Sequence, residues 1–272
     1  MATVRACVLY GFGINCDCET QHAFQSAGAF AERIHVNDLI SGGRKLSEFD
    51  ILAFPGGFSF GDDLGSGKVL GNKFKFNLKG ELAQFVADGK LVIGICNGFQ
   101  SLVKMGLLPG LDGDYFTQRA TLTFNDSGKF EDRWVHLKLN PSSKCVWTRG
   151  IEGLYLPVRH GEGKFVAGDS VLDELERNGQ VVAQYVNASG GIAGYPFNPN
   201  GSLRSIAGVC DPEGRIFGLM PHPEAYNHPT NHPRWTRGGV RGVEKHLGLK
   251  VFANAVGHAA ATKARRAAVV QG

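Results

Sequence analysis

The feature that most constrains the fold is a continuous apolar run, Leu91-Val-Ile-Gly-Ile95, that leads directly into Cys96. A strand that is apolar on both faces is buried on both sides, which is typical of a parallel sheet covered by helices. Other short apolar segments alternate with helical patterns before it, and this alternation predicts βαβ units. The expected strands before it are 5–10, 31–36 and 51–54, and the expected helices are 17–28 and 68–88.

Within the segment 68–88, the helical pattern places five apolar side chains on one face, namely Phe76, Leu78, Leu82, Phe85 and Val86. From about residue 115 the pattern changes to shorter, more alternating strands, which indicates an antiparallel extension or hairpins. Without repeats or linker-like stretches, residues 1–272 are expected to form a single domain. The later strands are expected at 118–124, 133–139, 155–158, 163–167, 181–186, 205–209 and 216–220, with helices at 97–105 and 244–267.

Composition excludes several classes of function. The net charge of +4 is small, and no Lys/Arg cluster interleaves with aromatic residues, so nucleic acid is not an expected partner. The N-terminus lacks the pattern of a signal peptide, and no apolar run reaches the ~18 residues of a membrane span. The six cysteines are dispersed without C-x-x-C spacing, which favours a reduced, cytoplasmic chain with no metal site.

Cys96 stands where the apolar strand meets a helical segment, in Gly94-Ile-Cys-Asn-Gly98. This is the pattern of a nucleophile elbow, in which a sharp turn raises the reactive side chain above the end of the sheet. Gly94 and Gly98 would let strand and helix approach closely, and the N-terminus of the helix favours a negatively charged thiolate. The pattern therefore predicts a nucleophile, although a buried structural cysteine at a strand end is the alternative.

A cysteine nucleophile needs a base, and the base needs an orienting group. Met220-Pro-His222-Pro-Glu224 follows an apolar strand, and its prolines hold the backbone extended, so His222 and Glu224 project to one side. His160 is the main rival, because Glu162 stands two residues on and a strand precedes it. His228 and His232 lack both features. Spacing alone leaves His222 and His160 open.

The segment Pro55-Gly-Gly-Phe-Ser59 follows the third strand. Attack on an amide creates an oxyanion that needs preorganised N–H donors. We assign the N–H of Gly57 as one donor and that of Asn97, directly after the nucleophile, as the other. An ordinary Pro-Gly turn is the alternative, and a phosphate-binding loop would need a G-K-[ST] sequence that is missing here.

Together these segments resemble the class I glutamine amidotransferases, and more narrowly the glutaminase subunits of phosphoribosylformylglycinamidine synthase. The likeness spans residues 4–256. The resemblance implies a flavodoxin-like α/β fold with a mainly parallel central sheet flanked by helices and an additional antiparallel part. The motifs that carry it are Gly94–Gln100, Pro221–Glu224, Gly13–Asp17, Pro55–Asp62 and Arg159–Gly163.

The resemblance also implies the activity. L-glutamine would be hydrolysed by Cys96, His222 and Glu224, and ammonia would pass to a large ATP-dependent synthetase subunit in purine biosynthesis. A small bridging subunit would join the complex, ATP and Mg would serve the synthetase, and this subunit would need no cofactor. The residues implied to hold glutamine are Gly56, Gly57, Phe58, Asn97 and Gln100. His160 and Glu162 would lie near the glutamine pocket or the partner, which favours His222 as the base.

Two departures and two rivals remain. The first loop reads Gly11-Phe-Gly-Ile14 where the family usually has Pro-Gly, and residues 225–242 extend the segment after the triad. One rival is a cysteine peptidase, another class I glutaminase or a γ-glutamyl hydrolase, acting without a partner. The other is a regulatory subunit that carries a relic triad, which would leave Cys96 unreactive toward glutamine analogues.

Overall fold

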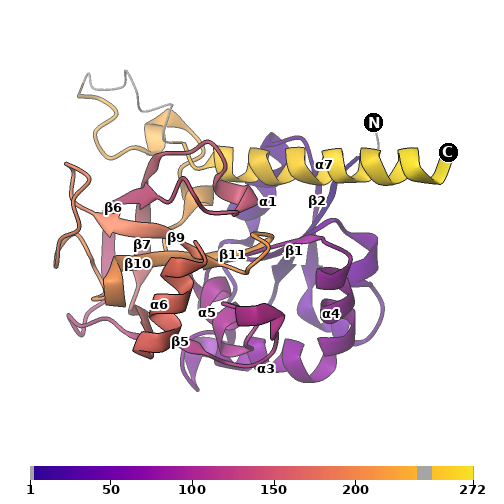
Figure 1. Ribbon diagram of the computed structural model, residues 1–272, viewed down its shortest axis with the longest axis horizontal. Helices are drawn as coiled ribbons and strands as arrows, with labels where there is room; N and C mark the ends of the chain where they lie inside the picture. The colour runs from indigo at the N-terminus through magenta and orange to yellow at the C-terminus, as the bar shows by residue number, and fades with distance from the viewer. Residues whose placement is uncertain (1–2, 238–246, 272) are drawn as a thin grey trace.

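A computed structural model describes residues 3–237 and 247–271. Within them, nine strands form one sheet in the order β2-β1-β3-β4-β11-β10-β9-β6-β7, and β5 pairs with β8 separately (Figure 1). The strands are β1 (Arg5–Tyr10), β2 (Phe30–His35), β3 (Ile51–Phe54), β4 (Leu91–Ile95), β5 (Ala120–Phe124), β6 (Glu131–Leu139), β7 (Gly153–His160), β8 (Glu162–Ala167), β9 (Val181–Val186), β10 (Ile206–Cys210) and β11 (Ile216–Leu219).

The sheet changes character at β11. Strands β2, β1, β3, β4 and β11 are parallel, whereas β10, β9, β6 and β7 continue it in antiparallel pairs. The 2-1-3-4-5 order of the parallel half is that of flavodoxin-like folds, as the resemblance implied. Leu219 pairs with Ile95, so β4 and β11 end side by side. The segments that follow them, with Cys96 and His222, are thereby brought to the same edge.

Helices cover both faces of the parallel half. The helix α1 packs against β1 and β2 and against the long α7, which crosses the top of the view in Figure 1. On the other face, α5 packs against β3, β4 and β11, and α3 lies against α5. The helices are α1 (Asp17–Ser26), α2 (Val36–Ile40), α3 (Lys68–Asn77), α4 (Lys79–Ala87), α5 (Asn97–Lys104), α6 (Asp169–Arg177) and α7 (Leu249–Gln271).

The prediction of a single helix over 68–88 was wrong. The chain forms α3 and α4, separated at Leu78, whose backbone leaves the helical region (φ −122°, ψ 11°). Phe76, near the end of α3, is exposed and so does not share the buried face that was expected, whereas Leu78, Leu82, Phe85 and Val86 are buried as expected. The helices α2 and α6 were not predicted. The expected start of the last helix at 244 lies outside the described residues, as do positions 238–242 of the extension.

The predicted antiparallel part is confirmed by β6, β7, β9 and β10 and by the β5–β8 pair. Within the described ranges, no helix has the combined length and hydrophobicity that crossing a bilayer requires.

Candidate active site

Cys96 occupies a strained turn between β4 and α5. Its backbone has φ 51° and ψ −107°, a conformation that residues with a Cβ rarely adopt. The strain is held in place because Cys96 N–H donates to Leu219 O (2.8 Å) and Gln100 N–H donates to Cys96 O (3.0 Å). The side chain is buried, and Sγ donates to Arg159 O at 3.7 Å. Such a local strain at one thiol is the geometry of a nucleophile elbow.

The two glycines of the elbow serve the close packing that the sequence predicts. A Cβ at Gly98 would lie 1.8 Å from Phe54 O, and one at Gly94 would lie 2.8 Å from Gly98 O. Real Cβ atoms do not approach backbone so closely, so larger residues would force α5 away from β3 and β4. The glycines therefore fix the position of the helix that begins directly behind Cys96.

His222 and Glu224 form a buried pair directly after β11. The backbone is anchored where His222 N–H donates to Pro157 O at 2.9 Å. His222 Nδ1 donates to Glu224 Oε1 at 2.6 Å, and both side chains are fully buried. Because Nδ1 carries the proton that it donates to the carboxylate, Nε2 is the nitrogen left to exchange a proton with a thiol. Nε2 has no hydrogen-bond partner among the residues that the structure describes.

The pKa of His222 is raised by its surroundings, which is what a base beside a thiolate requires. Burial alone would lower the pKa of His222, but the Glu224 carboxylate and then Cys96 outweigh it, so the pKa is raised well above its ordinary value. The imidazolium is thus stabilised once it has received a proton, which is the role of the orienting carboxylate in a triad.

His160, the rival left open by spacing, has a different environment. Its Nδ1 donates to Asn125 Oδ1 at 3.1 Å, because the Asn125 amide nitrogen already donates to His160 O. Glu162 faces elsewhere, accepting from Ser66 N–H at 3.3 Å. Burial and then His222 lower the pKa of His160 to about 3. The structure thus pairs His222, and not His160, with a carboxylate.

The expected oxyanion loop is tied to the first loop of the chain. Phe58 N–H donates to Gly13 O (2.8 Å) and Asn15 N–H donates to Gly56 O (3.2 Å), which makes a short antiparallel bridge around Ile14 and Gly57. The N–H of Gly57 itself has no partner among the described residues. Asn97 is the first residue of α5, so its N–H is also one that the helix leaves unpaired. Both assigned donors are therefore available.

Asn97 and Gln100 organise the loop around the nucleophile through their side chains. Asn97 Oδ1 accepts from Ser59 N–H (3.1 Å), and its Nδ2 donates to Asp62 Oδ1 (3.0 Å). Gln100 Nε2 donates to Glu162 O at 2.6 Å, and its Oε1 accepts from Asn97 at 3.2 Å. Gln100 thereby joins α5 to β8 and keeps the pocket wall in place.

A cavity of about 280 Å³ opens over Cys96. Acidic and basic groups both face it, which suits a small zwitterion. Of the five expected binding residues, Gly57, Phe58 and Gln100 line the cavity, whereas Gly56 and the buried Asn97 do not. A Cβ at Gly56 would lie 2.7 Å from His222 Cε1, so this glycine makes room for the base. The lining residues are Gly57, Phe58, Asp62, Ser66, Cys96, Gln100, Phe124, Gly128, Lys129, Phe130, Arg159, His160, Gly161 and Glu162.

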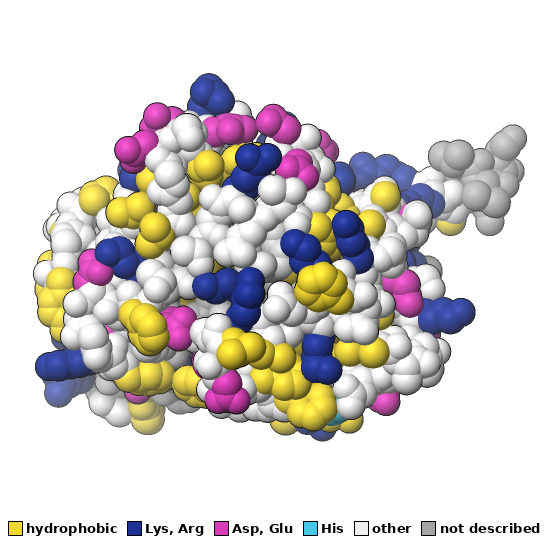
Figure 2. Space-filling view, turned by 90° about the horizontal axis from the view of Figure 1, so that it is seen from below, with side chains coloured by type: hydrophobic (Ala, Val, Ile, Leu, Met, Phe, Trp, Pro, Cys, Tyr) yellow, Lys and Arg dark blue, Asp and Glu magenta, His cyan; other side chains and the backbone are white. Residues whose placement is uncertain are grey.

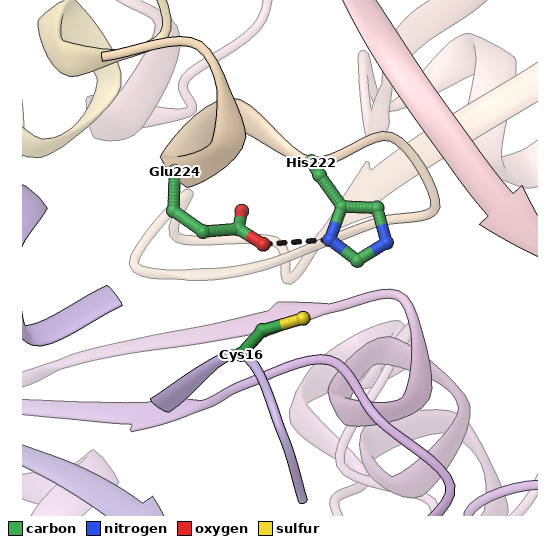
Figure 3. Close-up of side chains that lie close together, drawn as sticks. All are labelled: Cys16, His222 and Glu224. Atoms are coloured by element: carbon green, nitrogen blue, oxygen red, sulfur yellow. Dashed lines mark hydrogen bonds and ion pairs between the residues drawn. The ribbon is translucent and has the colours of Figure 1, made fainter. Parts of the chain in front are cut away.

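Sequence reasoning missed Cys16 and Arg159 as neighbours of the triad. In Figure 3 the Cys16 sulfur lies beside the His222–Glu224 pair, and donor atoms of all three lie within 4.8 Å of one another. Arg159 Nη2 lies 3.8 Å from Cys16 Sγ and 3.4 Å from His222 Nδ1. Since Nδ1 already donates to Glu224, the contact of Arg159 with it is electrostatic. No local pattern in the sequence could have revealed these contacts.

The described part of the extension, residues 225–237, is mostly exposed, but two of its aromatic side chains pack against strands β6 and β7. Tyr226 and His232 join Trp134 and Tyr155 in one aromatic cluster, with ring centroids 5.0 to 6.1 Å apart in the pairs that include Tyr226 or His232. Gly248 N–H then donates to Tyr226 O at 2.8 Å, just before α7. The segment thus links the triad loop to the last helix.

Comparisons with known proteins identify the family of this chain. A model of the CobB/CobQ-like glutamine amidotransferase domain matches residues 3–259. The phosphoribosylformylglycinamidine synthase subunit PurQ of Dehalococcoides mccartyi is 48% identical over 257 residues, covering 94% of this chain and 98% of that protein. PurQ of Methanococcus maripaludis is 46% identical over 233 residues, covering 85% of each.

Among solved structures, a chain in the structure of PurLQS from Thermotoga maritima is similar, with a TM-score of 0.70 and 32% sequence identity. The match covers 94% of this chain and 99% of that chain. Sequence, fold and site geometry thus lead to the same conclusion: the chain belongs to the CobB/CobQ-like glutamine amidotransferase family.

Proposed function

We propose that this chain is the glutaminase subunit of phosphoribosylformylglycinamidine synthase. It hydrolyses glutamine and delivers ammonia to the synthetase subunit that converts formylglycinamide ribonucleotide to formylglycinamidine ribonucleotide in purine biosynthesis. The relatives with this function are 46–48% identical to it over most of its length. The observation that supports the chemistry most directly is the 2.6 Å hydrogen bond from His222 Nδ1 to Glu224 Oε1. It lies at the same edge of the sheet as Cys96, whose backbone forms a strained elbow.

In the proposed mechanism, the Cys96 thiol gives its proton to His222 Nε2 and its sulfur attacks the side-chain amide carbon of glutamine. The N–H groups of Gly57 and Asn97 stabilise the oxyanion. His222, held by Glu224, then protonates the departing ammonia, which leaves a glutamyl thioester. Water activated by His222 hydrolyses the thioester and restores the thiol. Neither a metal nor a cofactor takes part in these steps.

The glutamine is proposed to lie in the cavity over Cys96, against Gly57, Phe58 and Gln100. Gly56 contributes by leaving space for the His222 ring, as its contact distances indicate. The mixture of Asp62, Glu162, Lys129 and Arg159 around the cavity supports binding of a molecule with both an ammonium and a carboxylate group.

The remaining assignments follow from the same function. The large synthetase subunit supplies the ATP and Mg chemistry, and a small bridging subunit joins the complex, whose name in the solved relative is PurLQS. We place the reaction in the cytoplasm, where a chain with six free cysteines stays reduced. We also propose that residues 1–272 act as a single domain, which the one continuous hydrophobic core of the described residues supports.

Replacing Cys96 by alanine tests the proposal in the assembled complex. We expect Cys96→Ala to abolish synthesis with glutamine and to leave synthesis with added ammonium salts intact, because the synthetase chemistry lies in the partner. Cys18→Ala, which changes an exposed thiol, is the matched control and should retain both activities. Loss of both activities from a folded Cys96→Ala complex would contradict ammonia transfer. Full glutaminase turnover by the isolated chain would instead favour a hydrolase that acts without a partner.

A further inference from the structure

Three buried side chains of different chemistry converge on one point behind the nucleophile. Cys16 precedes α1, and His222 and Glu224 follow β11, so the cluster joins segments from opposite ends of the chain (Figure 3). One sulfur, one nitrogen and one oxygen atom lie within 4.8 Å of one another. The mechanism uses His222 and Glu224 but leaves Cys16 without a role.

Two further observations indicate that this cluster has spare binding capacity. Glu224 Oε2 is fully buried and has no hydrogen-bond partner among the residues described, although Oε1 is bonded to His222. A buried carboxylate oxygen without a partner is costly unless something binds it. In addition, Gly56 has no side chain that would separate the thiol from the ring, because a Cβ there would lie 2.7 Å from His222 Cε1 and 3.3 Å from Cys16 Sγ.

We propose that Cys16, His222 and Glu224 form an inhibitory binding site for a thiophilic divalent cation, with Zn²⁺ as the best fit. Thiolate, imidazole and carboxylate are the ligand types that Zn²⁺ prefers, whereas Mg²⁺ prefers oxygen alone. Bond lengths of about 2.3 Å to sulfur and about 2.0–2.1 Å to nitrogen require the three side chains to draw together slightly.

Binding of Zn²⁺ at this site would inhibit the glutaminase reaction. This consequence rests on the proposed function. The Cys16 thiol releases its proton to water and binds the cation as a thiolate, and the Nδ1 proton of His222 moves to Nε2 as Nδ1 binds the cation in place of its hydrogen bond to Glu224. The proton that the ring retains is then on Nε2, so His222 can no longer accept the proton of Cys96. The base is lost while the nucleophile stays untouched.

Arg159 opposes the cation, since its guanidinium lies 3.8 Å from Cys16 Sγ and 3.4 Å from His222 Nδ1. This arginine also lines the pocket and lies between the pocket and the cluster. For Zn²⁺ to enter from the pocket, Arg159 must swing aside. The repulsion between the guanidinium and the cation lowers the affinity of the site for Zn²⁺, so removing the charge at position 159 should raise that affinity.

Direct binding provides the first test, in a Cys96→Ala background that removes the competing catalytic thiol. Zn²⁺ is titrated against a chromophoric chelator into full-length protein. We expect one site per chain, weakened at least ~100-fold by adding Cys16→Ser, since a thiolate ligand is lost. Adding Cys18→Ser, an exposed thiol two residues away, should change nothing. Equal affinity with and without Cys16 overturns the proposal, and so does a site that Mg²⁺ occupies equally well.

The same background tests the geometry. Adding Arg159→Gln should tighten Zn²⁺ binding at least ~10-fold, because a positive charge beside the cation is removed. X-ray absorption of the zinc-loaded protein should show one sulfur ligand, with nitrogen and oxygen as the others. Unchanged affinity in Arg159→Gln, or a spectrum without sulfur, contradicts the placement.

Glutaminase assays of the complex then test the consequence, with each protein compared to its own metal-free rate. Zn²⁺ should inhibit the wild type reversibly, with recovery after chelation, and Cys16→Ser should need at least ~10-fold more Zn²⁺. Inhibition of Cys16→Ser at the wild-type concentration would assign the effect to Cys96 and sink the proposal. A chain without glutaminase activity would contradict the proposed function alone, because the binding measurements decide the site independently.

Discussion

The two buried histidines near Cys96 have pKa values that their surroundings shift in opposite directions. Glu224 keeps a proton favourable on His222, whose pKa is raised, whereas burial and the nearby His222 keep His160 neutral. One bonds a carboxylate and the other bonds the neutral amide of Asn125. The carboxylate therefore determines which histidine serves as the base, and the other is a neutral wall of the pocket.

The neutral state of His160 predicts an acid-dependent loss of stability. Its pKa is about 3 in the folded chain and 6.5 as the ordinary value, so between these limits the unfolded chain holds one more proton. The free energy of unfolding should be fully retained above pH 6.5 and fall toward pH 3, by about 1.4 kcal/mol per pH unit from this residue.

Urea unfolding of the wild type and His160→Gln between pH 7 and pH 4 checks this. The variant should show the shallower fall with acid, whatever its stability at pH 7. His22→Gln, at an exposed histidine, should keep the wild-type slope. Identical slopes for the wild type and His160→Gln would mean that His160 is already charged in the folded chain.

At the residue scale, the sequence is informative wherever the chemistry depends on neighbours along the chain. The elbow glycines predict Cys96. The Pro-His-Pro-Glu spacing makes the His222–Glu224 pair a candidate, which the family resemblance then favours over His160. Arg159 contacts Cys16, which is 143 residues away along the chain, and His222, which is 63 residues away, so only the folded chain reveals these contacts. His160 was ambiguous for the same reason, because its partner Asn125 lies 35 residues away.

At the element scale, the junction of β4 and α5 depends on how closely the helix can approach the sheet. A Cβ at Gly98 would lie 1.8 Å from Phe54 O, and a backbone oxygen cannot move aside as a side chain would. We expect Gly98→Ala to lower the free energy of unfolding by about 1–3 kcal/mol and to reduce glutaminase activity, because α5 carries Asn97 and the turn at Cys96.

Gly257→Ala is the matched control. It lies inside α7, where nothing stands within 4 Å of the added Cβ, so alanine should raise the free energy of unfolding by about 1 kcal/mol through helix propensity. Chemical denaturation and glutaminase assays of both variants decide the point. A Gly98→Ala variant that is as stable and active as Gly257→Ala would refute the packing argument.

Element prediction succeeded where burial sets the pattern and failed where it does not. The strands β1, β3 and β4 are fully or largely apolar and were placed correctly. The break at Leu78 could not be predicted from the apolar pattern. Leu78 is buried in the structure, and the pattern of a single continuous helix predicts a buried Leu78 as well. The helix α6 was not predicted because only two of its side chains, Leu172 and Leu175, are buried. Two apolar residues are too few to give a helical pattern in an otherwise polar segment.

At the scale of the whole molecule, the active-site edge exposes aromatic side chains around the cavity. Phe58, Phe124 and Phe130 line it and are all exposed. Hydrophobic side chains also reach the surface on the face shown in Figure 2. Exposed apolar groups that rim a functional pocket often mark a binding surface for another protein. The ammonia released at Cys96 must reach a synthetase, so this edge is where we expect the partner to dock.

Phe130 and Phe30 offer a matched comparison, because both are 53% exposed. Phe130 lines the cavity, whereas Phe30 begins β2 and so lies at the opposite edge of the parallel sheet from Cys96. We expect Phe130→Ser to raise the Kd for the synthetase about tenfold, equivalent to about 1.4 kcal/mol, and Phe30→Ser to leave it unchanged. Thermal unfolding establishes that both variants keep their fold, and titration calorimetry gives the affinities. Equal weakening by the two variants, or weakening by Phe30→Ser alone, would place the synthetase elsewhere and require ammonia to leave by a route other than the cavity mouth.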